Sequence, residues 1–168
     1  MGWYSERVLP ALIERGMDNK EMAKHRPLVP PLATGCVLEV GIGPGLNLEH
    51  YGEQVTHVFG LEPSAALLEK AAERAEGKPY TVDLIEAGAE AIPLERDSVD
   101  TVVTTWTLCS IPELECSLQE MRRVLKPGGR LLFLEHGRAP EHGVARWQDR
   151  LTPLTRKLLG CALNLSLI

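Results

Sequence analysis

Short apolar runs alternate with amphipathic segments along most of this chain. Apolar runs bounded by glycine, proline and polar residues are typical of β-strands. We expect five strands, at residues 36–40, 57–61, 80–85, 97–105 and 130–135. Apolar residues recur at helical spacing within residues 65–76 and 113–125, so these segments are predicted to be helices. Strands that alternate with helices predict an α/β architecture.

Two short helices are expected before the first strand. Apolar side chains recur at helical spacing within residues 3–16, and residues 17–26 form a second helix that prolines end. Both helices would lie across the mouth of the sheet. Trp3 and Tyr4 either close over a bound ligand or anchor a helix on the core, and the sequence leaves both interpretations open.

The turn after the first strand is rich in glycine. Gly41, Gly43 and Gly45 stand at alternate positions, and a helix is expected to begin at Leu46. Glycine tolerates positive φ and lets a ligand approach the backbone closely. A strand, a glycine-rich turn and a helix N-terminus together predict a socket for a nucleotide-like ligand.

The spacing of this turn differs from that of a dinucleotide site. The glycines follow a G-x-G-x-G pattern, whereas dinucleotide sites use G-x-G-x-x-G. Pro44 removes one N–H that a pyrophosphate would need. Glu39 would repel a phosphate and attract a cation. The turn therefore favours a nucleoside that carries positive charge over a phosphate-rich ligand.

A second acid follows the second predicted strand. Glu62 lies at the carboxyl end of this strand, 21 positions beyond Gly41. At this place and spacing an acid can bind both hydroxyls of a ribose. A helix cap is the usual role of an acid after a strand, but its combination with the glycine turn favours a ribose ligand.

Composition narrows the functional classes. The chain has 168 residues, of which 44% are hydrophobic, and this suits one domain with a core. The net charge is -5 without a cluster of Lys or Arg, which argues against a nucleic-acid-binding surface. No apolar run is long enough to span a bilayer, and the charged N-terminal segment is unlike a signal peptide. We therefore expect a cytoplasmic protein without an integral membrane segment.

Four cysteines are present, and none forms a C-x-x-C pair or stands beside a histidine at metal-ligand spacing. Free, mostly buried thiols are expected under cytosolic redox conditions, and no metal site is expected.

Several segments resemble one family. Residues 37–45, VLEVGIGPG, are similar to the first motif of class I S-adenosylmethionine-dependent methyltransferases, and residues 123–134, RVLKPGGRLLFL, resemble a late structural motif of that family. Within it, residues 126–129 are predicted to form a turn. The segments GAEAIPL, DSVDTVVTTWTLCSI and LEHG resemble the small-molecule branch that includes quinone-biosynthesis and thiol methyltransferase-like members, the latter more closely.

The resemblance implies a cofactor, S-adenosylmethionine, and residues that bind it. It implies that Glu39 serves the methionine end and that the glycines pass beneath the cofactor. Residues 86–94 resemble the loop that lies along the adenine, although Gly88 stands where many members have Asp. The loop after the fourth strand makes Trp106 and Leu108 further candidates to line the methyl-transfer site. The expected cofactor-binding residues are Glu39, Gly41, Gly43, Gly45, Glu62, Pro63, Ala89, Glu90 and Thr105.

The resemblance also implies the fold. We expect a Rossmann-like, doubly wound parallel sheet with strand order 3-2-1-4-5, without the final two strands of the usual seven. Residues 1–168 would form one domain, with N-terminal helices (1–31), a cofactor-binding core (35–135) and a helical tail (136–168) that we expect to be truncated. The fifth strand would be an exposed edge, or one that a second copy covers in a homodimer.

The expected function is methyl transfer to a small-molecule acceptor such as a thiol or a quinol. His136 follows the fifth strand and is either a general base for this reaction or a loop histidine. A module that binds the cofactor without transferring a methyl group is the alternative, because the final strands are missing. A nucleotide-dependent oxidoreductase fits less well, because Pro44 and Glu39 suit a pyrophosphate badly.

Overall fold

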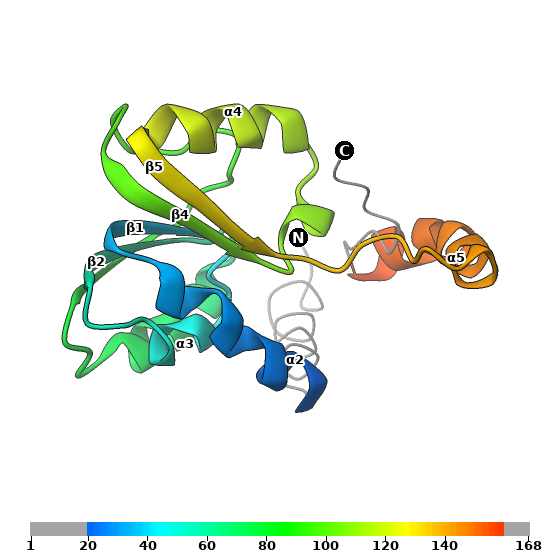
Figure 1. Ribbon diagram of the computed structural model, residues 1–168, viewed down its shortest axis with the longest axis horizontal. Coiled ribbons are helices and arrows are strands. Elements are labelled where there is room, and N and C mark those ends of the chain that lie inside the picture. The colour runs from blue at the N-terminus through cyan, green and yellow to red at the C-terminus, as the bar shows by residue number, and fades with distance from the viewer. Residues whose placement is uncertain (1–19, 160–168) are drawn as a thin grey trace.

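The computed structural model describes residues 20–159 and the side chains of residues 22–155. The expected helix at 3–16, with Trp3 and Tyr4, lies outside the described residues, as do the start of the 17–26 helix and Cys161. The central element is a five-stranded parallel sheet (Figure 1). Its order, β3-β2-β1-β4-β5, confirms the expected topology. The strands are β1 (Gly35–Val40), β2 (Val55–Leu61), β3 (Thr81–Ile85), β4 (Val99–Thr105) and β5 (Leu125–Leu134).

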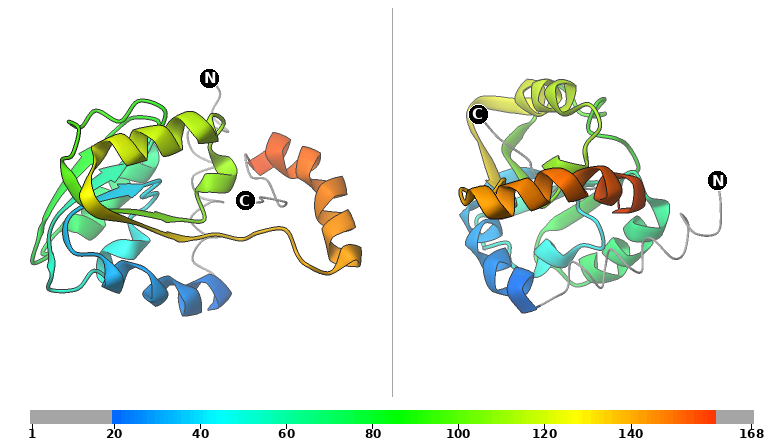
Figure 2. Two further views of the ribbon diagram at one scale, coloured as in Figure 1. Left: turned by 45° about the horizontal axis from the view of Figure 1, so that its top comes forward. Right: turned by 90° about the vertical axis from the view of Figure 1, so that its right-hand side faces the viewer.

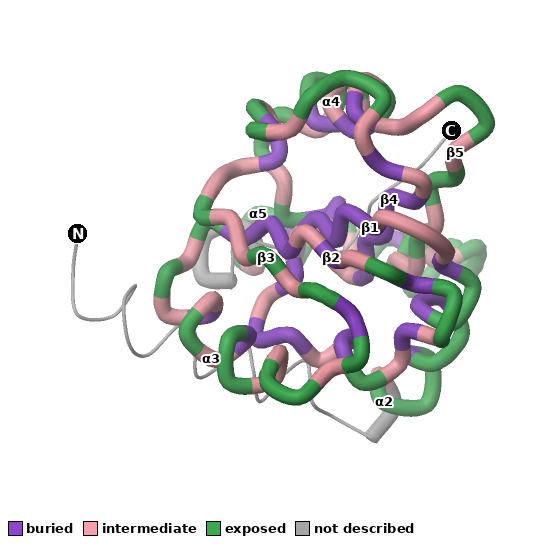
Figure 3. Tube along the Cα trace, turned by 90° about the vertical axis from the view of Figure 1, so that its left-hand side faces the viewer, coloured by how far each residue is buried: buried purple, intermediate pink, exposed green. Residues whose placement is uncertain are grey.

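Helices cover both faces of the sheet (Figure 1). On one face, Leu68 and Ala75 of α3 (Ala65–Ala75) pack against a cluster that includes Val37 of β1. On the other face, Met121 of α4 (Leu114–Val124) packs in a cluster with Val102 of β4. Figure 3 shows that burial is concentrated along the central strands. A strand covered on both faces is expected to be apolar along its length, which explains the apolar run in β1, broken only by Glu39.

The expected turn at residues 126–129 is part of β5. Val99 pairs with Leu125 and Thr101 pairs with Arg130, so the register shifts at this point. Gly128 has φ 82°, and the Lys126 ammonium lies 2.8 Å from a carboxylate oxygen of Asp100. The predicted turn residues therefore form an irregularity within β5, between the paired residues Leu125 and Arg130.

The helix expected after Gly45 is also shorter than predicted. A single 3-10 turn, η4 (Leu46–Glu49), occupies this place. Asn47 and Leu48 are buried in it. The remaining short elements are α2 (Lys20–His25), η2 (Arg26–Leu28), η3 (Pro30–Leu32) and η5 (Leu108–Ser110).

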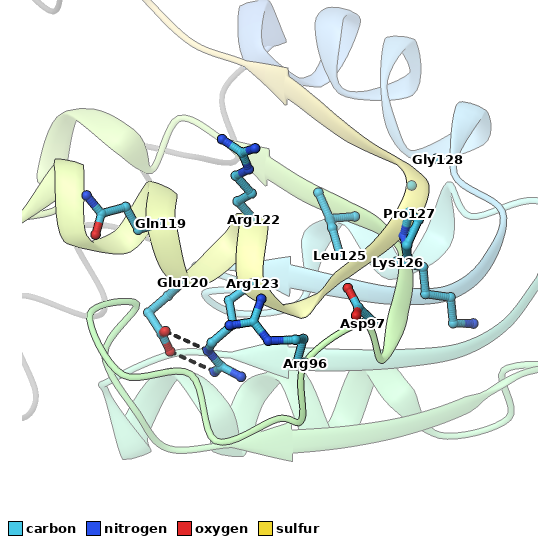
Figure 4. A pocket seen from close by; sticks show the side chains of 11 residues that line it. Arg96, Asp97, Gln119, Glu120, Arg122, Arg123, Leu125, Lys126, Pro127 and Gly128 are labelled. Carbon is cyan, nitrogen blue, oxygen red and sulfur yellow. Dashed lines mark hydrogen bonds and ion pairs between the residues drawn. The ribbon is translucent and has the colours of Figure 1, made fainter.

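Residues 86–98, which connect β3 to β4, contain no helix. Arg123 of α4 holds part of this connection by donating hydrogen bonds to the carbonyl oxygens of Ile92 and Leu94, each at 2.8 Å. The same guanidinium forms a two-point ion pair with Glu120 (Figure 4). Arg123 and Glu120 line a hollow of about 670 Å³. The hollow lies beside residues 96–97, which precede β4, and residues 125–129, which begin β5. It is therefore at the opposite end of the strands from the glycine turn.

The last described helix, α5 (His142–Leu159), lies beyond the carboxyl ends of the strands and apart from the sheet (Figures 1 and 2). One side of it exposes Val144, Trp147, Leu151 and Leu154. Among residues 20–159, no helix has both the length and the apolar character needed to cross a membrane.

Candidate active site

The glycine turn follows β1 at the carboxyl edge of the sheet. Gly41 has φ 71°, and its N–H donates to the carbonyl oxygen of Leu61 at 2.8 Å. A Cβ on Gly41 would lie 2.3 Å from Cγ2 of Thr107. Since such a contact is impossible without displacement, glycine is required here for the turn to lie between the ends of β2 and β4.

The other two glycines of the turn have different surroundings. Gly43 has φ 54°, and a Cβ on it would meet nothing within 4 Å. Gly45 has φ 81°, and its Cβ would lie 3.0 Å from Cα of Ala71 on α3. Gly45 therefore allows the turn to pack on α3, whereas Gly43 faces open space.

Glu62 connects this turn to the end of β2. One of its carboxylate oxygens accepts a hydrogen bond from the Ser64 N–H at 3.1 Å, and the other accepts from the Gly43 N–H at 3.3 Å. Its exposed fraction is 9%, and this burial raises the pKa of its carboxyl group. Pro63, beside it, is exposed. The turn and Glu62 therefore face each other across the carboxyl ends of β1 and β2.

Glu39 lies deeper than expected for a residue that contacts a ligand directly. Its exposed fraction is 1%. Its two carboxylate oxygens accept hydrogen bonds from Asn47 Nδ2 at 2.8 Å and from the Tyr51 hydroxyl at 2.7 Å. Burial raises the pKa of Glu39 to about 7 in spite of these donors. Glu39 thus places an acidic group beneath the turn.

The sequence interpretation missed the partners of Glu39. Arg26 is buried and donates to Asn47 Oδ1 at 2.9 Å, while Asn47 Nδ2 also donates to Thr105 Oγ1 at 3.0 Å. The Arg26 guanidinium lies 5.0 Å from the ring centroid of Trp106. One signal for this network was available, because an acid within a buried strand requires nearby donors or a cation. Its members could not be located, because they lie far apart in the sequence, in η2, η4, β4 and the segment that follows η4.

In the expected adenine loop, Glu90 lies beside Gly88, the position of the missing acid. Ala89 is buried in the core cluster beneath α4. A Cβ on Gly88 would lie only 2.1 Å from Glu90 Oε2. The carboxylate of Glu90 therefore occupies the place where a side chain at position 88 would begin.

The loop after β4 is fixed by β5. Trp106 has φ 52°, and its N–H donates to the Leu134 carbonyl oxygen at 2.7 Å. The N–H groups of Thr107 and Leu108 both donate to Glu135 Oε1, at 2.8 and 3.0 Å. Leu108 is buried in the core, whereas Trp106 is half-buried above the end of β4. Burial raises the pKa of Glu135 to about 7.

This geometry, a glycine turn opposed by an acid at the end of β2, agrees with the comparisons with known proteins. The sequence profile of the methyltransferase domain matches residues 38–133. The chain belongs to the methyltransferase domain family. The resemblance to S-adenosylmethionine-dependent methyltransferases inferred from the sequence is thereby confirmed.

Curated relatives of this methyltransferase domain differ in their acceptors. The human protein named thiol S-methyltransferase is 31% identical over 168 residues, which cover 96% of this chain and 69% of the relative. The ubiquinone/menaquinone biosynthesis C-methyltransferase of Rhizobium rhizogenes is 36% identical over 104 residues, covering 59% and 40%. The rat thiol S-methyltransferase is 36% identical over 133 residues, and this chain spans only 54% of its length.

Solved structures share the fold of this methyltransferase domain. The YcgJ protein of Bacillus subtilis superposes with a TM-score of 0.68 at 23% identity, over 95% of this chain and 63% of the other. A protein of Thermotoga maritima described as a possible histamine N-methyltransferase gives 0.67 at 24% identity, over 90% and 68%. At this level of identity, the similarity concerns the fold alone.

The methyltransferase domain thus brings most of its expected site residues to one edge of the sheet. The turn residues, Glu62 and Thr105 lie at the ends of β1, β2 and β4, and residues 88–90 follow β3. His136 lies one position beyond Glu135, after the end of β5. The sequence interpretation missed Arg26, Asn47, Tyr51, Thr107 and Glu135.

Proposed function

We propose that this chain binds S-adenosylmethionine over the glycine turn and transfers its methyl group to a small-molecule thiol or quinol. The observation that carries the proposal is the opposition of Gly43 and Glu62. Gly43 faces open space, and the carboxylate of Glu62 lies within hydrogen-bond distance of its N–H. The names of the curated relatives support both acceptor classes.

Glu62 has the capacity to bind a ribose. Each of its oxygens accepts one backbone N–H, and each carboxylate oxygen can accept a second hydrogen bond. Two ribose hydroxyls would use the remaining positions. Pro63 lies beside this carboxylate, where the exposed ring would contact the sugar.

The adenine is assigned to residues 88–90. In many family members an Asp at the position of Gly88 accepts a hydrogen bond from the adenine amino group. Here the carboxylate of Glu90 reaches the same place and would take over this role. The Ala89 N–H would donate to a ring nitrogen.

The charges around the turn favour a cationic cofactor. Glu39, Glu62 and Glu135 lie at this edge of the sheet, and Arg26 is the buried cation among the described residues of the site. S-adenosylmethionine carries a sulfonium and an ammonium group, so an excess of carboxylates attracts it. Asn47 and Thr105 would position the methionine end above Glu39.

The cofactor supplies the reactive methyl group, and the protein supplies position and environment. Transfer is an in-line displacement, in which the acceptor, the methyl carbon and the departing sulfur must align. The half-buried Trp106 and the loop after β4 would shape the acceptor side. The acceptor lies at the carboxyl ends of β4 and β5, next to Glu135 and His136.

The test is isothermal titration of the purified chain with S-adenosylhomocysteine, followed by transfer assays with a panel of thiols and quinols. We expect micromolar binding, roughly -8 kcal/mol, and a methylated product from one acceptor class. A folded sample that does not bind S-adenosylhomocysteine would contradict the proposal. Binding without product from any acceptor would leave the cofactor assignment standing and remove the transfer reaction.

A further inference from the structure

Three side chains that commonly bind metals meet beside the proposed acceptor site. Cys109 belongs to η5, which follows β4, and Glu135 and His136 follow β5. One potential ligand atom of each residue lies within 4.8 Å of the other two. Cys109 is buried, and the other two are half-buried. The sequence interpretation missed this cluster because its members come from the ends of two different strands.

Glu135 gives an independent reason to expect a ligand here. Its Oε1 atom accepts two backbone N–H groups, which fix the orientation of the carboxylate. Its Oε2 atom is buried and has no hydrogen-bond partner. A buried carboxylate oxygen without a partner is costly unless a cation compensates for it.

The donor set identifies the class of cation. A thiolate, an imidazole nitrogen and a carboxylate oxygen are together typical ligands of zinc, whereas calcium and magnesium prefer oxygen alone. Zinc–ligand distances of about 2.0–2.3 Å place tetrahedral ligand atoms about 3.5 Å apart. The three atoms, now within 4.8 Å of one another, would have to approach more closely to bind one ion.

We propose that Cys109, Glu135 and His136 form a binding site for a thiophilic divalent cation of the zinc class. Three protein ligands leave one tetrahedral position open, as in catalytic zinc sites, whereas structural sites use four. The N–H groups of Thr107 and Leu108 hold the carboxylate from outside the site, which is the usual role of groups around a metal ligand.

The open position suits a thiol acceptor, and this choice of acceptor rests on the proposed function. On binding, the acceptor thiol loses its proton to solvent and its sulfur occupies the open position as a thiolate. Its lone pair then forms the bond to the methyl carbon, while the sulfonium bond breaks and its electron pair remains on the sulfur of S-adenosylhomocysteine. No oxidant or reductant is needed.

The site is tested with cobalt(II), which replaces zinc and absorbs in the near ultraviolet when a thiolate binds it. Metal-free protein, prepared with a chelator, is titrated without cofactor or acceptor. We expect a thiolate-to-cobalt band that saturates at about one equivalent and disappears when zinc is added. Cys109→Ser should abolish this band. Glu135→Gln and His136→Gln should weaken cobalt binding at least about tenfold, a loss in the range of single-interaction effects around metal sites.

Cys116→Ser is the matched control, because Cys116 is an exposed free cysteine on α4. This variant should keep the band, and circular dichroism should show that each variant is folded. If wild-type protein gives no thiolate band, or if the band survives in folded Cys109→Ser protein, the metal site is wrong. If the half-buried His136 variant is folded and binds cobalt as tightly as wild type, the three-ligand assignment is also wrong.

The metal site and the proposed function fail in different ways. Cobalt binding with no binding of S-adenosylhomocysteine would support the metal site and contradict the proposed function. If metal-free protein methylates thiols as fast as zinc-loaded protein, activation of the acceptor by the metal is overturned.

Discussion

Glu39 is an acid in the middle of an apolar strand, and its environment determines its charge. Asn47 and Tyr51 donate to it, and Arg26 lies one residue further away in the network. Desolvation outweighs these donors, so its pKa rises to about 7. The folded protein therefore binds a proton at this position that the unfolded chain releases near pH 4.5.

This difference predicts how stability depends on pH. A carboxyl group with a raised pKa in the folded state contributes stability below its unfolded pKa, and that contribution is lost as the pH rises through the folded pKa. The free energy of unfolding should therefore fall between pH 5 and pH 8, by about 2 kcal/mol through Glu39. Chemical denaturation at several pH values measures this fall in the free energy of unfolding.

Glu39→Gln separates this effect from that of other titrating groups. Glutamine keeps an acceptor for Asn47, and the Tyr51 hydroxyl can reverse its role and accept from the new amide. The fall in stability should be smaller in the variant by about the same 2 kcal/mol. Equal pH slopes for wild type and variant would show that Glu39 has an ordinary pKa in the folded protein.

Glu62 gives a prediction on binding. Glu62→Gln keeps the shape of the side chain but replaces one acceptor with a donor, so one proposed ribose hydrogen bond is lost. Affinity for S-adenosylhomocysteine should fall by about tenfold or more, since hydrogen bonds to charged groups contribute about 1.5–3 kcal/mol. Calorimetry measures the change.

Glu69→Gln on α3 is the control for Glu62→Gln, because Glu69 is exposed and lies outside the proposed site. Its affinity and thermal midpoint should match those of wild type. The assignment of Glu62 to the ribose fails if both variants bind S-adenosylhomocysteine equally well.

At the scale of the element, the glycine turn combines two requirements that the sequence pattern does not distinguish. Gly41 allows close packing against Thr107, and Gly43 faces the open space where we propose that the cofactor lies. Gly41→Ala should lower the thermal midpoint clearly, because its Cβ would collide with Thr107. Gly43→Ala should lower the free energy of unfolding by about 1 kcal/mol, because alanine is strained at a positive φ. It should also lower cofactor affinity much more than Gly41→Ala does.

The comparison of these two alanine variants is the measurement. Thermal denaturation and titration with S-adenosylhomocysteine are performed on both proteins. If Gly43→Ala binds normally, the cofactor does not lie over this part of the turn. If Gly41→Ala is as stable as wild type, the contact with Thr107 does not restrict position 41.

The elements also show what the sequence could predict. Strand order followed from motifs such as residues 37–45, because this family resemblance brings the topology with it. Local patterns predicted a turn at residues 126–129 but not its place inside β5, where the register with β4 shifts between Leu125 and Arg130. The network around Glu39 was not predicted either, because Arg26, Asn47 and Thr105 meet only after the sheet has formed.

At the scale of the molecule, the two ends of the parallel strands carry different groups of residues. The carboxyl ends of the strands bring together the glycine turn, Glu62 and the Cys109 cluster. Near the opposite end, Arg123 pairs with Glu120 of the same helix (Figure 4) and fastens the β3–β4 connection to α4 by donating to the carbonyl oxygens of Ile92 and Leu94. The proposed binding residues and the hydrogen bonds of Arg123 therefore lie at opposite ends of the same strands.

The lateral edge of the sheet gives the last prediction. β5 is an outer strand, and Leu131 and Phe133, two positions apart, have exposed fractions of 37% and 50%. An edge strand with unpaired backbone groups and exposed apolar side chains favours pairing with another chain. We expect this chain to self-associate, with a molar mass that rises with concentration in light scattering. Phe133→Lys should shift the population toward the monomer, because a charged edge resists pairing.

Leu28→Lys is the matched control, because Leu28 in η2 is even more exposed but lies outside the sheet. It removes an apolar side chain and adds the same charge, so any general effect of charge on association appears in it as well. Association that falls in Phe133→Lys and persists in Leu28→Lys would place the contact at β5. An equal loss in both variants would indicate non-specific attraction between apolar side chains, and a wild-type monomer at every concentration would show that the β5 edge does not pair.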